Sequence, residues 1–516
     1  MTATAPATAP IAGSDASPDA PPRWLIRAAA ALGALTLAVY ARALGAGFFS
    51  DDYEWLGRMT PALERPLYVF RVFYRDFNPL LHASFVLDFL LGGGTAPVFH
   101  ATSLLLHAAT TTLVVLLCAR LAGNAWAALG AGLLWGTGVR ISEAVIWPAA
   151  RGHALAALFV LAGLLVLTGS SRRKVLWAAA LFAAGLLTKE VAFFPMLLAP
   201  LFARDRATRR SAAVAVGVLA VLFVAFNVLC KSEYHTSGEG MGAMLLKLPF
   251  VVLRPIGLGD SYDFSTTGFV LFAAGAAGLV LLCRGSSPAR LGVLWIALCA
   301  APILPLEKVS SRYLYLLSIG YPLLACGLLA HPRFPRLSND VRRAAVALGG
   351  VTVILLAVTN ALLVQREIAD YGILGQPYDA CFRTLRAPAL ALSPGETLVV
   401  SETQPRAVIP FLAGLMEQRG NIRKLIPERA DGVGGMIGLA DLVNAARPAR
   451  TGALAVAADP ADPGPRRIYL WDGRAALATD ALPVPAPGRV LAARLVPCPV
   501  FFGQTGSAPL PQTDPR

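Results

Sequence analysis

The feature that most constrains this chain is a succession of long apolar runs, each separated from the next by a short polar segment. They cover approximately 24–42, 97–118, 124–138, 153–169, 175–188, 191–203, 211–230, 266–283, 291–306, 313–330 and 344–364. A straight transmembrane helix needs about 20 predominantly apolar residues, so the shorter runs need neighbouring helices or water to shield their polar ends. The pattern predicts an all-α polytopic membrane bundle of about 11 transmembrane helices.

The composition favours a membrane protein and argues against nucleic-acid binding. Of the 516 residues, 56% are hydrophobic and only 15% are charged, which is too few polar side chains to cover a soluble globule of this size. The net charge of +14 would suggest nucleic acid in a soluble protein. Here the basic residues lie in short loops between apolar runs, where they set topology. We therefore expect membrane lipid as a partner, and no nucleic acid.

The basic residues occupy alternate gaps between the runs, and this alternation predicts the orientation. The basic gaps contain Arg23 with Arg27, Arg120, 172–174, 204–210, 284–290 and 333–343. Cytoplasmic loops of membrane proteins are enriched in Lys and Arg. The N-terminus is therefore predicted to be cytoplasmic and the chain end extracytoplasmic, while the usage of Ala, Arg and Gly suggests a bacterial inner membrane.

Three parts of the chain are distinguished by this topology. Residues 1–22 lack large apolar side chains and are predicted to form a disordered cytoplasmic tail. Residues 23–364 form the transmembrane domain, with a long external loop at 43–96. A cleaved signal peptide over 23–43 is the alternative to an uncleaved anchor, and the long preceding extension argues against it.

Residues 365–516 are predicted to form a small extracytoplasmic domain of α/β or mostly β structure. Alternating segments typical of strands occur at 397–400, 453–456 and 467–471, with Pro-rich stretches between them. Cys381 and Cys498 both fall in this domain. Export would allow them to form a disulfide, and the sequence leaves that pairing open.

The first external loop opens with Phe48-Phe49-Ser50 followed by two adjacent carboxylates, Asp51 and Asp52. A carboxylate at the membrane interface can act as a general base that takes a proton from an attacking hydroxyl. An ordinary solvated loop acid is the alternative for either residue alone. We predict these two residues as the catalytic candidates.

Histidines occur in the first loop, at His82, and on the second span, where His100, Ser103 and His107 share one helical face. Residues i and i+7 lie about 10 Å apart along a helix, too far for a shared metal shell without further ligands. Packing within the bundle or contact with substrate is favoured over metal binding. No metal site is predicted, although a divalent ion is left open.

Three external segments that are distant in sequence carry further charges. By the alternation of spans, Arg151, Lys189 and Arg312 lie at the membrane level of Asp51 and Asp52. Such cations can hold a phosphate and stabilise the charge of a phosphate leaving group, although each alone could be a snorkelling helix end. The candidate substrate-binding residues are Arg151, Lys189, Glu190, Arg312, Tyr313, His82, His100, His107 and Glu143.

These residues together favour a membrane glycosyltransferase. A polyprenyl-phosphate sugar is the expected donor, and an acceptor hydroxyl on a glycan, lipid or protein attacks the anomeric carbon after deprotonation by Asp51 or Asp52. Direct displacement inverts the configuration. No cofactor is indicated.

The order and sidedness of the motifs resemble the GT-C superfamily of polytopic glycosyltransferases, and within it the protein O-mannosyltransferases and the TMTC-type O-mannosyltransferases. The matching pieces, over residues 40–330, are Phe49-Ser50-Asp51-Asp52, Asn78-Pro79-Leu80 with Asp88, His100 and His107, 142–147 with Arg151, Thr188-Lys189-Glu190, and 311–315. The resemblance implies a GT-C-like fold, a lipid-phosphate sugar donor, Asp51 as base with Asp52 as partner or substitute, and Arg312 as a ligand of the donor phosphate.

Several positions depart from the TMTC pattern. Val139-Arg140 stands where that pattern has His-Pro, Gly152-His153 interrupts the acidic follow-up to Arg151, and Ser103 replaces an Asn. The tail also lacks tetratricopeptide repeats. The donor sugar and the acceptor therefore stay open.

Two other function classes fit a polytopic chain. A transporter or lipid flippase would predict paired repeats and interrupted helices in matching halves, and neither is evident. An envelope oligosaccharide polymerase or ligase usually carries its reactive residues in a large late loop, whereas the paired acids here come early. The transferase is favoured over both.

Overall fold

The structure is a computed structural model of the whole chain. It describes residues 21–48, 52, 55–56, 59–63, 65–71, 77–230, 241–258, 266–306, 309–330 and 339–390, together with four strands in the C-terminal region. The tail predicted to be disordered therefore lies almost entirely outside the described residues.

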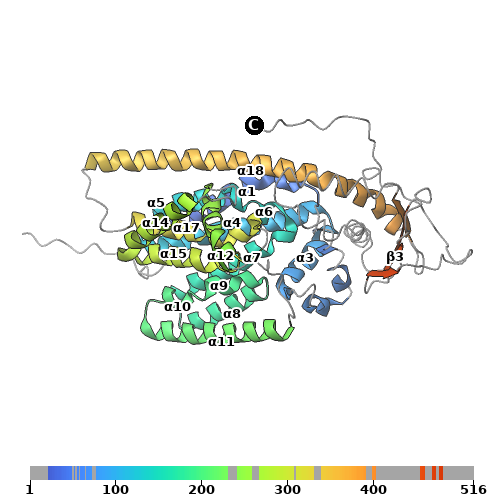
Figure 1. Cartoon of the computed structure of the whole chain (residues 1–516), viewed down its shortest axis with the longest axis horizontal. Helices are drawn as coiled ribbons and strands as arrows, with labels where there is room; N and C mark the ends of the chain where they lie inside the picture. The colour runs from blue at the N-terminus through green and yellow to red at the C-terminus, as the bar shows by residue number, and fades with distance from the viewer. Residues whose placement is uncertain are drawn as a thin grey trace, which may run out of the picture.

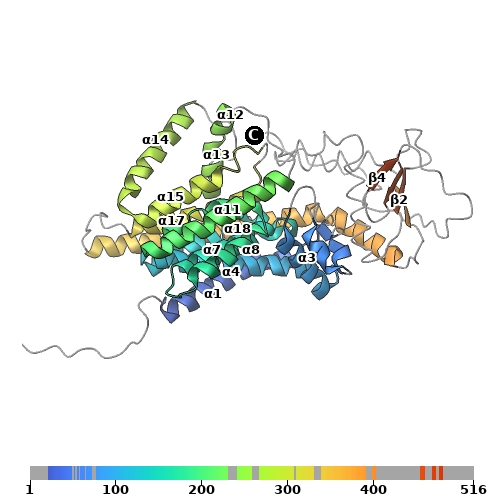
Figure 2. The same ribbon diagram turned by 90° about the horizontal axis from the view of Figure 1, so that it is seen from below.

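Seven helical segments in the described part of the chain are long and apolar enough to cross a membrane. They are Arg23–Gly45, Ala96–Ala122, Pro148–Leu167, Arg206–Val228, Thr267–Gly285, Ser311–Leu329 and Arg343–Gly372. Each coincides with one of the predicted runs, and the chain is an all-α polytopic membrane bundle in this region (Figures 1 and 2). The class predicted from hydropathy is thus confirmed, with about seven spans.

The α-helices are α1 (Arg23–Tyr40), α3 (Pro79–Gly92), α4 (Ala96–Ala122), α5 (Ala125–Gly136), α6 (Glu143–Ile146), α7 (Gly152–Leu167), α8 (Lys174–Leu186), α9 (Phe193–Met196), α10 (Ala199–Phe202), α11 (Arg206–Cys230), α12 (Met241–Leu246), α13 (Leu248–Leu253), α14 (Thr266–Leu282), α15 (Ser287–Ala300), α16 (Leu314–Ser318), α17 (Gly320–Leu329) and α18 (Asn339–Leu390). The 3-10 turns are η1 (Ala41–Gly45), η2 (Thr60–Leu63), η3 (Pro66–Phe70), η4 (Val139–Ile141), η5 (Pro148–Ala150), η6 (Glu190–Ala192), η7 (Arg254–Ile256), η8 (Cys283–Gly285) and η9 (Ser311–Tyr313).

The remaining predicted runs form shorter helices. Runs 124–138, 175–188 and 291–306 contain the apolar helices α5, α8 and α15. Run 191–203 is divided into η6, α9 and α10. Pro195 and Pro200 lack the N–H that a continuous helix needs, which accounts for that division.

Helices α15 and α17 pack backbone against backbone through glycine. A Cβ placed on Gly292 of α15 would lie 2.5 Å from the backbone N of Leu324, and one on Gly327 of α17 would lie 2.2 Å from the N of Ala289. Small residues at helix interfaces permit such an approach in membranes, where packing replaces the hydrophobic effect as the driving force. Both helices contact α16, which packs in turn against the turn η9 of the candidate site.

Helices α8 and α11 are tied together at their starts by Asp205, the residue before α11. Its carboxylate accepts hydrogen bonds from the backbone N and the hydroxyl of Thr208, both at 2.7 Å, and Lys174 of α8 donates to it at 3.3 Å. The bonds from Thr208 make it an N-cap, and they lower the pKa of Asp205 from 3.8 to about 2.

Because this folded-state pKa is depressed, the carboxylate of Asp205 stabilises the fold fully above pH 3.8 and loses that effect as the pH falls through about 2. We expect the difference in unfolding temperature between wild type and Asp205→Ala to be constant near neutral pH and to shrink below pH 3.8. Asp340→Ala is the control, since its pair with Arg343 is almost fully exposed. A difference that grows on acidification would contradict the capping role.

Helix α18 is longer than its membrane span. It has 52 residues, and a rise of 1.5 Å per residue gives about 78 Å, more than twice the hydrocarbon thickness. It lies along the bundle in Figure 1, and Gln365 donates to the carbonyl of Val39 in α1 at 2.6 Å. The helix thus continues across residue 365, where the sequence predicted the start of a separate domain.

The C-terminal region contains four short strands: β1 (Leu398–Glu402), β2 (Leu454–Ala458), β3 (Ile468–Trp471) and β4 (Ala476–Thr479). They form one sheet in the order β1-β2-β3-β4, in which β1 and β2 are parallel and the other pairs antiparallel. The first three strands overlap the segments that the alternating pattern predicted. Cys498 and the side chain of Cys381 lie outside the described residues, so their pairing stays a prediction.

Candidate active site

A buried ion pair joins α3 to the start of α7. Arg151, directly before α7, donates to the carboxylate of Asp88 in α3, and both side chains are fully buried. Thr102 of α4 donates to the same carboxylate at 2.6 Å. The Arg151 guanidinium also lies over the rings of Phe85 and Phe99, at 4.0 and 5.6 Å from their centroids. Arg151 is therefore placed to hold α3, α4 and α7 together.

Glu143, at the start of α6, anchors the segment that carries Arg312. Its carboxylate accepts from the hydroxyl of Ser310, from the backbone N of Arg312 at 3.1 Å and from the Arg312 guanidinium at 3.2 Å. The guanidinium lies 4.7 Å from the Trp147 ring centroid and 5.2 Å from that of Tyr313. Glu143 thus holds Ser310 and Arg312, which follow it by 167 and 169 positions in the sequence. The Arg312 side chain is partly exposed.

Arg254 also holds the segment that carries Arg312. Arg254 donates to the carbonyl of Val309 at 2.7 Å and to the hydroxyl of Ser311 at 3.4 Å. Lys247 likewise donates to the carbonyl of Leu306 at 3.1 Å. The stretch before η9 is thus held by backbone contacts that the sequence did not reveal.

His153 lies in the first turn of α7, within the electrostatic influence of Lys189 and Arg312. Its imidazole is 1% exposed, packs edge-on against the ring of Tyr313 at 5.5 Å, and has no hydrogen-bond partner on either nitrogen among the described residues. Lys189 pairs with Glu190 at 3.4 Å, and its Cδ lies beside Gly152. Lys189 and Arg312 therefore approach the buried imidazole of His153 through its neighbours Gly152 and Tyr313, at the start of α7.

Asp52 is the member of the acidic pair that the structure describes. Its side chain is 1% exposed and accepts a hydrogen bond from the backbone N of Ala149 at 2.7 Å, and its charge acts on Arg151. This places Asp52 against the turn η5 that leads into α7. Asp51 lies outside the described residues.

The three predicted histidines are buried within the protein. His107 donates to the carbonyl of Gly136 at 2.8 Å and accepts from the hydroxyl of Tyr315 at 2.8 Å, so both nitrogens are used in packing. His100 donates to the carbonyl of Gly47 at 3.4 Å, and His82 donates to that of Val69 at 2.7 Å. Within the described ranges, no group of three or more His, Cys, Asp or Glu side chains could hold a metal ion.

The structure thus gathers Glu143, Lys189, Glu190, Arg312 and Tyr313 around the start of α7, with Asp52 on the adjoining turn. His82, His100 and His107 bond instead to backbone carbonyls, and His107 also to Tyr315, and their role in substrate binding stays a prediction. Sequence reasoning left Asp88 and His153 out of the candidate set. Both could have been included from the sequence, because a charged side chain or an imidazole inside an apolar segment requires a partner.

Comparison with known proteins gives limited similarity. No family model matches the chain. The protein O-mannosyl-transferase Tmtc2 of Drosophila melanogaster is 34% identical over 194 residues, covering 33% of this chain and 20% of the relative. The protein O-mannosyl-transferase tmtc2 of Xenopus laevis is 32% identical over 146 residues, covering 26% of this chain and 17% of the relative.

Solved structures were also compared. The crystal structure of ArnT from Cupriavidus metallidurans in the apo state gives a TM-score of 0.46 at 16% identity, covering 72% of this chain and 81% of that one. ArnT bound to undecaprenyl phosphate gives 0.45 at 15% identity, covering 72% and 82%. By sequence, the chain is distantly similar to the TMTC O-mannosyl-transferases over 33% of its length, and the matched segment is about a fifth of the Drosophila relative.

Proposed function

We propose that this chain is a membrane glycosyltransferase that moves a sugar from a polyprenyl-phosphate donor to an extracytoplasmic hydroxyl with inversion. The observation that carries the proposal is the buried imidazole of His153, which Lys189 and Arg312 approach through Gly152 and Tyr313, with neither of its nitrogens hydrogen-bonded in the described part of the chain. The names of the sequence relatives support the same reaction class.

A phosphate is the ligand that best completes this constellation. Leaving a buried donor unsatisfied costs about 1–3 kcal/mol, so a ligand that supplies an acceptor is favoured there. Phosphate oxygens accept from imidazole, ammonium and guanidinium alike. Since a phosphate leaving group gains negative charge as the sugar departs, the same cations would lower the barrier to transfer.

In the proposed mechanism, Lys189 and Arg312 hold the donor phosphate and Asp52 or Asp51 accepts the proton of the attacking hydroxyl. The new bond forms between that oxygen and the anomeric carbon while the bond to the phosphate oxygen breaks. Arg151 is assigned a positioning role in place of the phosphate-binding role predicted from the sequence. Because its guanidinium is buried against Asp88, it positions α7 rather than contacting the donor.

The topology proposed from the sequence accompanies this function. The shorter helices α5, α8 and α15 and the divided run at 191–203 would complete about eleven crossings, provided that neighbouring helices or water shield their polar ends. The N-terminus is then cytoplasmic, and the C-terminal region lies on the side of the candidate site. The membrane proposed is the bacterial inner membrane.

The contribution of Arg312 tests this proposal. We expect Arg312→Gln to lower kcat/KM for sugar transfer by about 10²–10³-fold, the effect of losing one donor to transition-state charge. Transfer from a radiolabelled polyprenyl-phosphate sugar by purified protein measures it. Since Arg312→Gln also leaves Glu143 without its cation, the double variant Glu143→Gln/Arg312→Gln is the control. Recovery of transfer in the double variant would mean that Arg312 only neutralises Glu143, and would contradict phosphate binding.

A further inference from the structure

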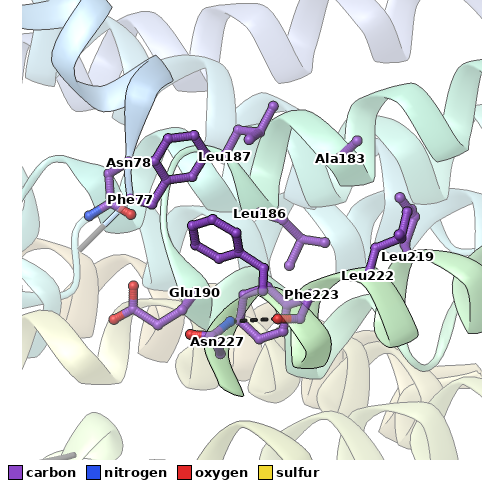
Figure 3. Close-up of a pocket in the computed structure, with 11 residues that line it drawn as sticks. Phe77, Asn78, Ala183, Leu186, Leu187, Glu190, Leu219, Leu222, Phe223 and Asn227 are labelled. Carbon is purple, nitrogen blue, oxygen red and sulfur yellow. Dashed lines mark hydrogen bonds between the residues drawn. The ribbon is translucent and has the colours of Figure 1, made fainter. Parts of the chain in front are cut away.

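A cavity of about 310 Å³ lies between α8 and α11, beside the residues that precede α3. In Figure 3, Asn78, Glu190 and Asn227 lie toward one end, and Ala183, Leu219 and Leu222 lie toward the other. The cavity therefore has a polar end and an apolar body. None of the steps of sugar transfer proposed above uses it.

The apolar body has the shape and surroundings of a site for a hydrocarbon chain. Along α11 it extends from Leu219 to Asn227, which is about 12 Å at 1.5 Å per residue. Leu222, which lines it, is 61% exposed, so the cavity opens toward the surroundings of α11. α11 is one of the seven membrane-crossing segments. An aliphatic chain can therefore enter from the bilayer.

The polar end selects the head group. Asn78 is 2% exposed, and its amide nitrogen has no hydrogen-bond partner among the residues described. Glu190 contributes a carboxylate, and Asn227 a second amide. An uncharged hydroxyl group can accept from the Asn78 amide and donate to the carboxylate. A phosphate would instead face the negative charge of Glu190, so an anionic head group is disfavoured.

The polar end also adjoins the candidate active site. Leu80 donates from its backbone N to the carbonyl of Leu187 at 3.1 Å, which ties the start of α3 to the end of α8. Glu190 pairs with Lys189, whose side chain passes beside Gly152 and leads to His153. A hydroxyl bound at Asn78 is thus placed next to the proposed phosphate site without occupying it.

We propose that this cavity binds the acceptor, and that the acceptor is an amphiphile with a hydroxylated, uncharged head group and a hydrocarbon chain. That the ligand is the acceptor rests on the proposed function. That it is an uncharged amphiphile rests on the cavity alone. It differs from a polypeptide acceptor, which would not require an apolar cavity along a membrane helix.

Photolabelling tests the ligand class independently of catalysis. The purified full chain is reconstituted in nanodiscs with glucosyl diacylglycerol that carries a diazirine in one acyl chain. Phosphatidylglycerol with the same diazirine chain is the anionic counterpart, and a photoreactive threonine peptide represents a protein acceptor. Leu219→Trp fills the cavity, and Val218→Trp is the matched control, because Val218 is 54% exposed on the same helix. Labelled peptides are located by mass spectrometry.

We expect the neutral glycolipid to label the segments 183–187 and 219–227 about tenfold more than phosphatidylglycerol, and Leu219→Trp to remove that preference while Val218→Trp keeps it. Equal labelling by both lipids, equal effects of the two tryptophan variants, or labelling by the peptide alone would overturn the proposal. Asp52→Asn should label as wild type does. Selective labelling without sugar transfer would support the ligand class but remove the transferase and, with it, the acceptor role of the cavity. Transfer without selective labelling would support the transferase and overturn the ligand class.

Discussion

Replacing Arg151 with methionine is expected to destabilise the protein by about 3–5 kcal/mol, because it leaves the carboxylate of Asp88 buried without its counter-charge. Both side chains of the pair are fully buried. Without Arg151, the hydroxyl of Thr102 is the hydrogen-bond donor left to the Asp88 carboxylate among the described residues. The cation above Phe85 and Phe99 is lost as well. The midpoint of thermal unfolding in detergent and the yield of folded protein measure the effect.

The double variant Asp88→Leu/Arg151→Met separates loss of the pair from loss of packing. Replacing both members of a buried ion pair with apolar side chains is often neutral or stabilising. We therefore expect the double variant to unfold closer to wild type than Arg151→Met does. If the single variant unfolds at the wild-type temperature, the pair does not hold α3 against α7, and the positioning role of Arg151 is wrong.

Asp52→Asn is expected to lower kcat for sugar transfer by about 10²–10⁴-fold with little change in KM, as removal of a general base does. Asparagine retains the shape of the side chain and can still accept from the backbone N of Ala149. The folded structure should therefore persist. Initial rates at varied acceptor concentration give the two constants separately.

Asp205→Asn is the matched control for that substitution. Asp205 is an acid that caps α11 and pairs with Lys174, on the side predicted to be cytoplasmic. We expect its variant to transfer sugar at the wild-type rate. A similar loss in both variants would point to a general effect of removing a negative charge, and not to base catalysis at Asp52.

The membrane-spanning helices were predictable because hydropathy is a local property of the sequence. Long apolar runs such as 211–230 appear as single helices, whereas the orientation predicted from Arg and Lys stays a prediction. What the sequence could not supply was the partner of each charge. Glu143 and Arg312 are separated by 169 positions and meet only through the packing of α6 against η9.

The contacts that escaped prediction are those with backbone acceptors or with residues outside the expected motifs. Arg254 donates to the carbonyl of Val309. Every residue has a backbone carbonyl, so the sequence does not indicate which one accepts. Arg151 looked like a phosphate ligand because its carboxylate partner, Asp88, lies in another helix. The length of α18 also escaped, since residues beyond 364 lack the hydropathy of a span and include Gly372, Gly375 and Pro377, which disfavour a helix.

The most direct test of the central claim is transfer of a radiolabelled sugar from polyprenyl-phosphate donors to envelope acceptors. Membranes that contain wild type, Asp51→Asn or Asp52→Asn at matched protein levels are compared. The account predicts transfer by wild type and its loss in Asp52→Asn, and loss in Asp51→Asn alone would instead identify Asp51 as the base. Transfer that is unaffected by either substitution would contradict the mechanism, and would leave a transporter as the better description of this chain.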